Sequence, residues 1–228
     1  MYTKGRTGSN VLANLLSCHP EVFCDHELFH SIYADTKVIF PYLYIRSRSK
    51  SLSEINKSVY GFRVKRIQLQ LEHKYKNYKE ILQKFYRKDW KFIYLVRENH
   101  LRHRISNLIS AQTQIYHLKK LESLSIQKIS VNCNELLKSI KLSEQNEQLE
   151  KWDLENIQYI KIVYEKDLLN NNIHQVTADK IFNFLGLSNH KVETDYRKAT
   201  PEKLEDLIIN YEEVFQFFKD TKYAKFLL

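Results

Sequence analysis

Met1-Tyr2-Thr3-Lys4-Gly5-Arg6-Thr7-Gly8-Ser9-Asn10 is the stretch at residues 1–10. Apolar residues at helical spacing follow it, namely Val11, Leu12, Leu15 and Leu16. The chain has 4 glycines, and two of them, Gly5 and Gly8, flank Arg6 in this stretch. Glycine adopts the positive φ angles that a tight loop needs and lets an anion approach the backbone amides. A loop that leads into a helix also presents free N–H groups and the positive end of the helix dipole. The stretch therefore predicts a loop that binds a phosphate or sulfate group.

Two simpler readings compete with this one. The stretch lacks the Gly-Lys-Ser/Thr ending of a Walker A loop, so a nucleoside-triphosphate hydrolase is a poor match. An ordinary glycine turn that caps a helix at Ser9 would also produce this pattern. The rest of the chain has to decide between these possibilities.

Length and composition predict a single globular domain over residues 1–228, with a sizeable core. Hydrophobic residues make up 43% of the chain and aromatic residues 13%, which excludes a disordered class. The formal net charge of +9 favours an anionic partner. Nucleic acid, a membrane surface and a polyanionic nucleotide all satisfy that preference, so charge alone does not choose.

Cysteine usage and hydropathy predict a soluble cytoplasmic protein. Cys18, Cys24 and Cys133 include no CxxC motif, so neither a disulfide framework nor a metal site is expected. No apolar run reaches the roughly 18 residues of a membrane span, and no signal-peptide pattern is present. A phosphate loop normally follows a buried strand. Only three residues precede Lys4, so the first strand is expected to be very short or truncated.

Strand-like and helical segments alternate along the chain, which predicts an α/β fold with a central parallel sheet between helical layers. The expected strands are residues 21–30, 59–65, 92–96, 126–131 and 157–163. The segment 31–57 is expected to be irregular or short-helical. Helices are expected at residues 9–18, 72–87 and 133–150. A long helix is also expected after Arg97, with Leu101, Ile105, Leu108 and Ile109 facing inward. Two more are expected near the C-terminus, one capped by Thr177 and ended by Gly186 and a last long one that Thr200-Pro201 opens.

The loop resembles the 5′-phosphosulfate loop of sulfotransferases that use 3′-phosphoadenosine 5′-phosphosulfate (PAPS). In that family a basic residue, Ser or Thr, Gly and two small polar residues open the first helix, and Arg6-Thr7-Gly8-Ser9-Asn10 matches this order. Residues 94–106 resemble a second family segment, in which an arginine after a central strand and a later helical serine hold the 3′-phosphate. Arg97 and Ser106 take those positions, and an arginine fork suits phosphate geometry. Weaker similarities cover residues 61–65, 163–168, 210–214 and 221–223.

On these segments the chain is identified as a member of the bacterial, carbohydrate-type branch of the family. The resemblance implies a three-layer α/β sandwich with the topology of P-loop nucleoside-triphosphate hydrolases. It implies transfer of a sulfonate from PAPS to a hydroxyl of a glycan or glycolipid, without a metal. The implied cofactor-binding residues are Gly5, Arg6, Thr7, Gly8, Ser9, Asn10, Arg97, Ser106, Arg197 and Lys198. Helical spacing also places Arg102, Ser106 and Ser110 on one face, which is expected to be available to the nucleotide.

Sulfuryl transfer needs a cation at the bridging oxygen, donors around the sulfonate and a base for the acceptor hydroxyl. Arg6 fits the first role, and the backbone of residues 7–10 with the Thr7 and Ser9 hydroxyls fits the second. For the base, Glu27 is preferred, because the resembling enzymes place an acid or histidine after the second structural segment. His26 and His30 are alternatives that act near neutral pH without tuning. Glu165 and Asp167 are interpreted as structural.

Three other functions remain open at this point. A P-loop nucleotide kinase lacks support, because no lysine follows Gly8 and no apolar strand ends in an aspartate for magnesium. A non-catalytic module could bind nucleic acid or acidic glycans through basic residues, but these are scattered among acids without an aromatic platform, so no nucleic-acid partner is expected. These basic residues are Arg46, Arg48, Lys50, Arg63, Lys65 and Arg66. A degenerate, inactive sulfotransferase with a short first strand is the third.

Overall fold

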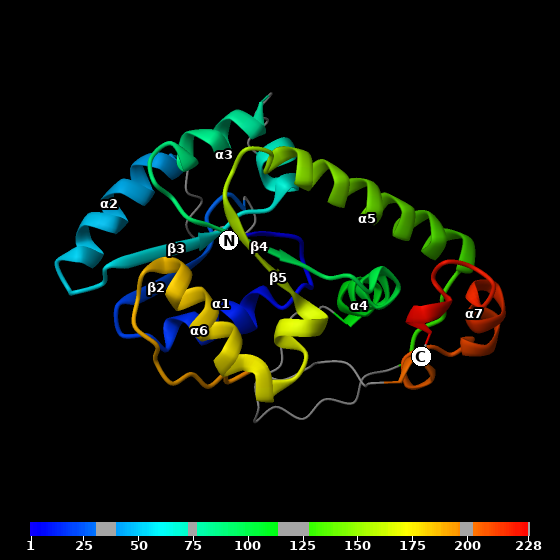
Figure 1. Cartoon of the computed structure of the whole chain (residues 1–228). Coiled ribbons are helices and arrows are strands. Elements are labelled where there is room, and N and C mark those ends of the chain that lie inside the picture. The colour runs from blue at the N-terminus through cyan, green and yellow to red at the C-terminus, as the bar shows by residue number, and fades with distance from the viewer. Residues whose placement is uncertain (31–39, 73–76, 114–127, 197–202, 228) are drawn as a thin grey trace. The chain divides into compact units, whose positions relative to one another are not determined.

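The structure is a computed structural model that describes residues 1–30, 40–72, 77–113, 128–196 and 203–227 (Figure 1). Contacts divide the chain into two compact units. The first unit combines Met1–Val96 with Glu150–Thr194, and the second combines Arg97–Leu149 with Asp195–Leu228.

The first unit contains a parallel sheet of five strands. These are β1 (Tyr2–Thr3), β2 (Val22–Glu27), β3 (Val59–Arg63), β4 (Phe92–Val96) and β5 (Tyr159–Val163). Parallel pairing joins β2 to β3, β1 to β4 and β4 to β5. The Thr3 N–H donates to Val64 O (3.1 Å) and the Val64 N–H donates to Met1 O (2.9 Å), which connects β3 to β1. The order is therefore β2-β3-β1-β4-β5, with β1 in the centre.

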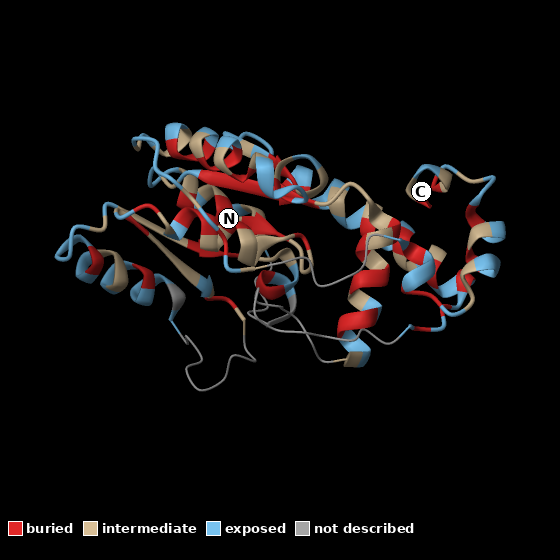
Figure 2. Ribbon diagram, turned by 90° about the horizontal axis from the view of Figure 1, so that it is seen from below, coloured by how far each residue is buried: buried red, intermediate tan, exposed pale blue. Residues whose placement is uncertain are grey.

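Alternating side chains of β4 separate the core of this unit into two layers. Ile93 and Leu95 pack with α1 (Ser9–Ser17) and α6 (His174–Leu185) in one cluster. Phe92, Tyr94 and Val96 pack in another cluster with α3 (Tyr78–Tyr86). All five residues of β4 are buried, as expected of a central parallel strand covered on both faces. Figure 2 shows the buried residues concentrated along the strands and on the helices beside them. The predicted α/β fold with helices on both faces of a parallel sheet is confirmed.

A cavity lies beside β1, and Met1 and Tyr2 are among the residues that line it. β1 pairs with β4 only through Tyr2 and Thr3. Residues of β3 and the first two residues of β4 line a cavity of about 440 Å³. The aromatic side chains of Tyr60, Phe62, Phe85 and Trp90 form one of its walls.

Several expectations for the first unit need correction. The segment 31–57, expected to be irregular or short-helical, contains α2, a regular helix of 13 residues (Pro41–Ser53), and its residues 31–39 lie outside the described residues. Thr177 does not cap α6, which begins at His174. Its hydroxyl instead donates to the Asp167 carbonyl (2.8 Å). Gly186 does end α6 with a left-handed φ of 84°, as predicted. Asp167 accepts a hydrogen bond from the Val163 N–H (2.6 Å), in agreement with a structural role. π-Helical turns follow β3 (Gln68–Glu72) and β5 (Tyr164–Leu168).

The second unit is helical. It contains α4 (His100–Thr113), most of α5 (Cys133–Asp153) and α7 (Tyr211–Phe218), with short 3₁₀ turns at Leu204–Asp206 and Ala224–Phe226. Leu101, Ile105 and Ile109 of α4 are buried as expected, but Leu108 is 38% exposed, so its inward placement was wrong. The expected strand at 126–131 is a single bridge between Ile129 and Ile208, and residues 126 and 127 lie outside the described residues.

The predicted last helix is interrupted, and Asn210 gives the physical reason. Its side-chain amide pairs with both backbone groups of Val131, donating to the carbonyl (2.9 Å) and accepting from the N–H (2.9 Å). The Ile209 N–H donates to the Ile129 carbonyl (2.9 Å). These long-range bonds hold residues 207–210 in a non-helical path, so α7 starts only at Tyr211. The Thr200-Pro201 start lies outside the described residues.

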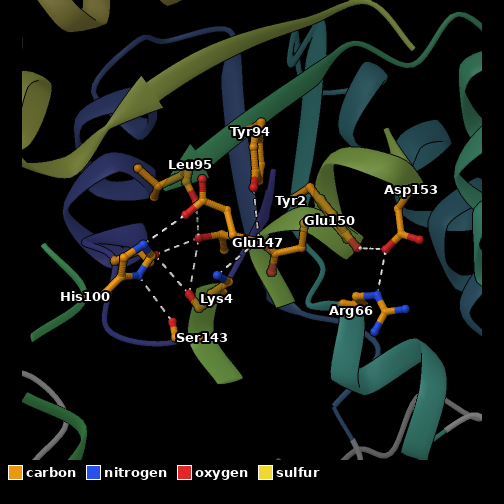
Figure 3. A network of polar contacts seen from close by, with 12 residues as sticks. Tyr2, Lys4, Arg66, Tyr94, Leu95, His100, Ser143, Glu147, Glu150 and Asp153 are labelled. Atoms are coloured by element: carbon orange, nitrogen blue, oxygen red, sulfur yellow. Dashed lines mark hydrogen bonds and ion pairs between the residues drawn. The ribbon is translucent and has the colours of Figure 1, made fainter. Parts of the chain in front are cut away.

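A buried polar network supports the first unit (Figure 3). The Tyr2 hydroxyl donates to Asp153 Oδ2 (2.7 Å), which also accepts from Arg66 Nε (2.9 Å). Asp153 is fully buried. Burial raises the pKa of Asp153, and the Tyr2 hydrogen bond and the Arg66 charge oppose that shift. Burial, followed by the neighbouring Asp153, raises the pKa of Tyr2 well above its usual value, so the phenol remains a donor.

Tyr2→Phe is expected to lower the free energy of unfolding by about 2 kcal/mol, because it removes a donor from a buried carboxylate and keeps the ring. Urea unfolding measures the change. The matched control is Tyr159→Phe, since that ring is 37% exposed and its hydroxyl has no hydrogen bond to the described residues. The control should change stability little. Equal effects of the two substitutions would contradict the importance of the Tyr2–Asp153 bond.

Candidate active site

The loop between β1 and α1 lies at the carboxyl end of the central strand, where open parallel sheets bind their ligands. Arg6 and Gly8 both have left-handed backbone, with φ of 62° and 86°. For glycine this conformation is ordinary, but for an arginine it costs about 1–2 kcal/mol. Gly8 is the N-cap of α1, and the first turn contains no acidic residue. The N–H groups at the start of α1 are therefore not neutralised by a carboxylate of that turn.

Hydrogen bonds inside the loop fix its path. The Thr3 and Thr7 hydroxyl oxygens lie 2.6 Å apart, and Thr7 Oγ1 donates to the Lys4 carbonyl (2.9 Å). Thr3 Oγ1 lies 2.9 Å from the Leu95 carbonyl, which ties the loop to β4. Thr7 is fully buried. Its hydroxyl thus serves the loop and not a ligand, which leaves its backbone N–H for the predicted binding role.

Gly8 packs directly against the turn after β5. A Cβ built on Gly8 would lie 2.7 Å and 3.0 Å from two ring carbons of Tyr164, and 3.2 Å from Leu168 Cδ1. Contacts under 3.0 Å do not occur without movement of the neighbour. Glycine is therefore required here by space as well as by φ.

Glu27 lies beside the loop at the end of β2. Its Oε2 forms an ion pair with Lys65 Nζ (2.7 Å) and accepts from Gln68 Nε2 (2.7 Å). Lys65 follows β3, and its Nζ lies 3.8 Å from the position that a Cβ on Gly5 would take. The structure thus brings the predicted base, through Lys65, next to the predicted anion loop.

His26 has a different environment from Glu27. Its Nδ1 lies 3.0 Å from Arg63 Nη2, and because a guanidinium can only donate, Nδ1 must be the acceptor. Arg63 also donates to Asn10 Oδ1 in α1. Arg63 therefore links the end of β2 to the start of α1, and the Nδ1 lone pair of His26 is occupied. His30, the other alternative, is partly buried, and its N–H donates to the Glu27 carbonyl (3.0 Å).

Lys4 adds a second lysine–carboxylate pair at the loop. Its Nζ lies 3.6 Å from Glu150 Oε2, and the Tyr94 hydroxyl donates to the same oxygen (3.1 Å; Figure 3). Glu150 is 3% exposed. Lys4 and Arg6 are cationic residues of the loop, and Arg63 and Lys65 lie at and after the end of β3; of these, Lys4 pairs with the carboxylate of Glu150 and Lys65 with that of Glu27.

The remaining predicted residues belong to the second unit or lie outside the described residues. Arg97 directly follows β4, and Ser106 lies in α4. Ser106 is 5% exposed and Ser110 is 4% exposed, so the expected open polar face of α4 is buried at both serines. Arg197 and Lys198 lie outside the described residues.

Sequence reasoning missed the contribution of β3. Arg63 and Lys65 were counted among the scattered basic residues and within the weaker similarity at residues 61–65 but were given no role in the site, and Gln68 was not considered. One signal was available for the first two, because they end a predicted parallel strand and such ends meet at one edge of the sheet. Gln68 carried no signal, since its position depends on the π-helical turn that follows.

The described residues contain neither a metal-binding group nor a membrane-spanning helix. No group of three or more His, Cys, Asp or Glu side chains in them is placed to hold a metal ion. No helix that the structure describes combines the length and the apolar character needed to cross a membrane.

Fold and loop together define an α/β protein of P-loop-like topology with a basic, glycine-containing loop after its central strand. No protein-family model and no curated protein matches the chain. Among solved structures, the chain is similar to a crystal structure of a sulfotransferase from Alicyclobacillus acidocaldarius, with 15% sequence identity and a TM-score of 0.49. The similarity covers 99% of this chain and 93% of the other. The roles of individual residues therefore rest on the geometry of this chain.

Proposed function

We propose that this protein is a sulfotransferase that transfers the sulfonate of PAPS to a hydroxyl group of a glycan or glycolipid. The observation that carries the proposal is the loop of residues 4–8, in which a non-glycine residue, Arg6, has left-handed backbone, and Gly5 lies beside the Lys65 ammonium that pairs with Glu27. Backbone strain of this kind clusters at functional sites. The order of residues 6–10 matches that of the phosphosulfate loop.

A carboxylate beside the anion loop favours a catalyst over a simple anion-binding module. A binding module gains nothing from Glu27, because a negative charge opposes an anionic ligand. A transferase that attacks with a hydroxyl group needs such a group, since the hydroxyl proton must leave as the new bond forms. Glu27 is preferred to His26 for this role, because His26 Nδ1 accepts from Arg63 and only the Nε2 side of the ring remains.

In the proposed reaction the acceptor oxygen attacks the sulfur of PAPS in line with the bridging oxygen. The bond between the acceptor oxygen and sulfur forms, the bond between sulfur and the bridging oxygen breaks, and adenosine 3′,5′-bisphosphate leaves. Glu27 takes the proton of the hydroxyl. Arg6 stabilises the negative charge that grows on the bridging oxygen, and the N–H groups of residues 7–10 with the Ser9 hydroxyl donate to the sulfonate oxygens. Arg97, Arg197 and Lys198 are proposed to hold the 3′-phosphate; Ser106, which the resemblance also implies, is only 5% exposed.

Calorimetric titration with adenosine 3′,5′-bisphosphate, ATP and AMP tests the nucleotide part of the proposal. We expect micromolar binding of the bisphosphate and much weaker binding of the other two. Arg97→Ala should lower the affinity for the bisphosphate by about 10- to 100-fold, which is the effect expected from losing hydrogen bonds to a charged group. Arg87→Ala removes the same charge from an exposed position after α3 and should leave the affinity unchanged. Equal affinities for the three nucleotides, or none, would contradict the proposed co-substrate.

A further inference from the structure

We infer that Gln68 is a positioning residue that holds the Glu27 carboxylate in place for the acceptor hydroxyl. The inference rests on the proposed function, in which Glu27 is the base. Gln68 is 1% exposed and begins the π-helical turn that follows β3. Its side chain lies between the backbone of Lys65 and the carboxylate of Glu27.

The orientation of the Gln68 amide follows from its partners. Gln68 Oε1 accepts from the Lys65 N–H (3.0 Å), and a backbone N–H can only donate. The NH₂ group must therefore face Glu27, where Nε2 donates to Oε2 (2.7 Å). A flipped amide would place two donors against each other at Lys65 and two acceptors against each other at Glu27. The Lys65 N–H therefore ensures that the NH₂ group, and not the carbonyl oxygen, faces Glu27.

The two carboxylate oxygens of Glu27 therefore have different hydrogen-bonding environments. Oε2 receives both the Lys65 ammonium (2.7 Å) and the Gln68 amide (2.7 Å). Oε1 has no hydrogen bond to the described residues, which leaves it for the acceptor hydroxyl. Two donors on one oxygen also fix the plane of the carboxylate, and proton transfer depends on that plane.

Lys65 alone would not hold Glu27 in position when an anion occupies the loop, and Gln68 supplies a second contact. The Lys65 ammonium lies beside Gly5 as well as Glu27, so an anion in the loop competes with Glu27 for it. Gln68 is neutral and hydrogen-bonded to the protein backbone, so an incoming anion does not attract it in the same way. It therefore keeps Glu27 in position when the loop is occupied.

Two substitutions separate positioning from a merely structural role. Gln68→Glu keeps the size of the side chain and an acceptor for the Lys65 N–H, but replaces the donor to Glu27 by a carboxylate. Gln68→Met keeps the approximate volume and loses both hydrogen bonds. If Gln68 only caps the Lys65 N–H, Gln68→Glu behaves like the wild type and rescues the defect of Gln68→Met. If Gln68 positions Glu27, both variants lose turnover.

The readout is the release of adenosine 3′,5′-bisphosphate from PAPS with water as the acceptor, because water is also a hydroxyl that must lose a proton. We expect kcat to fall by about 10- to 100-fold in both variants, as for a misplaced catalytic group, while KM for PAPS and the calorimetric affinity for the bisphosphate stay within about threefold of wild type. Gln70→Glu, the same change at an exposed position two residues away, should leave kcat unchanged. Urea unfolding verifies that each variant is folded.

Each outcome has one meaning. Wild-type kcat in Gln68→Glu overturns the positioning role and leaves the proposed function intact. A loss of bisphosphate affinity that matches the loss of kcat places Gln68 in nucleotide binding and also overturns it. A wild-type protein that neither binds the bisphosphate nor releases it from PAPS overturns the proposed function, and the role of Gln68 with it. If Gln68→Glu does not fold, Gln68→Met carries the test, and wild-type kcat in that variant overturns the inference.

Discussion

Arg6→Ala is expected to lower kcat for bisphosphate release from PAPS by about 10²- to 10³-fold, the cost of removing one group that stabilises developing charge. The guanidinium is the only part of Arg6 proposed to act on the bridging oxygen. Arginine and alanine both carry a Cβ, so the strain at a φ of 62° is similar in the two proteins. Backbone strain therefore does not distinguish the two proteins, and loss of turnover in a variant that urea unfolding shows to be folded would reflect chemistry.

Arg6→Gly provides the matched comparison. Glycine adopts left-handed backbone without a Cβ penalty, so this variant should be more stable than the wild type by about 1 kcal/mol in urea unfolding and equally inactive. Stabilisation together with inactivation would show that the strain at Arg6 is retained for function. Near-wild-type turnover in either variant would remove Arg6 from the mechanism.

Local patterns were sufficient for the elements whose surroundings match their sequence. The continuous apolar run at residues 92–96 predicted a fully covered central strand, and β4 is buried along its whole length. The loop followed by apolar residues at helical spacing predicted α1, and Gly186 predicted the end of α6. In each case one short segment contains the residues that favour the element and also the residues that the element buries or uses to end.

The sequence patterns failed where distant residues decide the local structure. The segment after Leu204 has helical spacing, but the pairing of Asn210 with Val131 and of Ile209 with Ile129 breaks it. Side-chain hydrogen bonds that compete with helix backbone are invisible without the partner. Ser106 and Ser110 look like a solvated face by periodicity, yet both are buried.

The candidate site was predictable in part for the same reason. The loop is contiguous in sequence, so its glycines and Arg6 could be singled out. Glu27 could be proposed as the base only together with the alternatives His26 and His30. The three residues are close in the sequence, and the sequence does not show which side chain faces the loop. The structure adds the partners from β3 and the turn after it, with Lys65 and Gln68 on Glu27 and Arg63 on His26, so Glu27 and His26 have different environments.

Gly8→Ala is expected to abolish measurable bisphosphate binding and to lower the free energy of unfolding by about 3 kcal/mol. A left-handed φ of 86° costs a non-glycine residue about 1–2 kcal/mol, and the new Cβ must also displace the Tyr164 ring from 2.7 Å. The backbone at Gly8 begins α1, so any shift there moves the N–H groups that are proposed to receive the sulfonate. Calorimetry and urea unfolding measure the two losses.

Gly186→Ala is the matched control, because it repeats the substitution at nearly the same backbone angle without the clash. Gly186 has a φ of 84°, and a Cβ there would meet no atom of the described residues within 4 Å apart from its own chain neighbours. It should lose about 1–2 kcal/mol of stability and keep its affinity for the bisphosphate. The difference between the two variants then isolates the contact with Tyr164, and adding Tyr164→Ala to Gly8→Ala should recover part of that difference. Equal losses in the two glycine variants would mean that packing of the loop against Tyr164 contributes nothing, and the anion site would then depend on backbone angle alone.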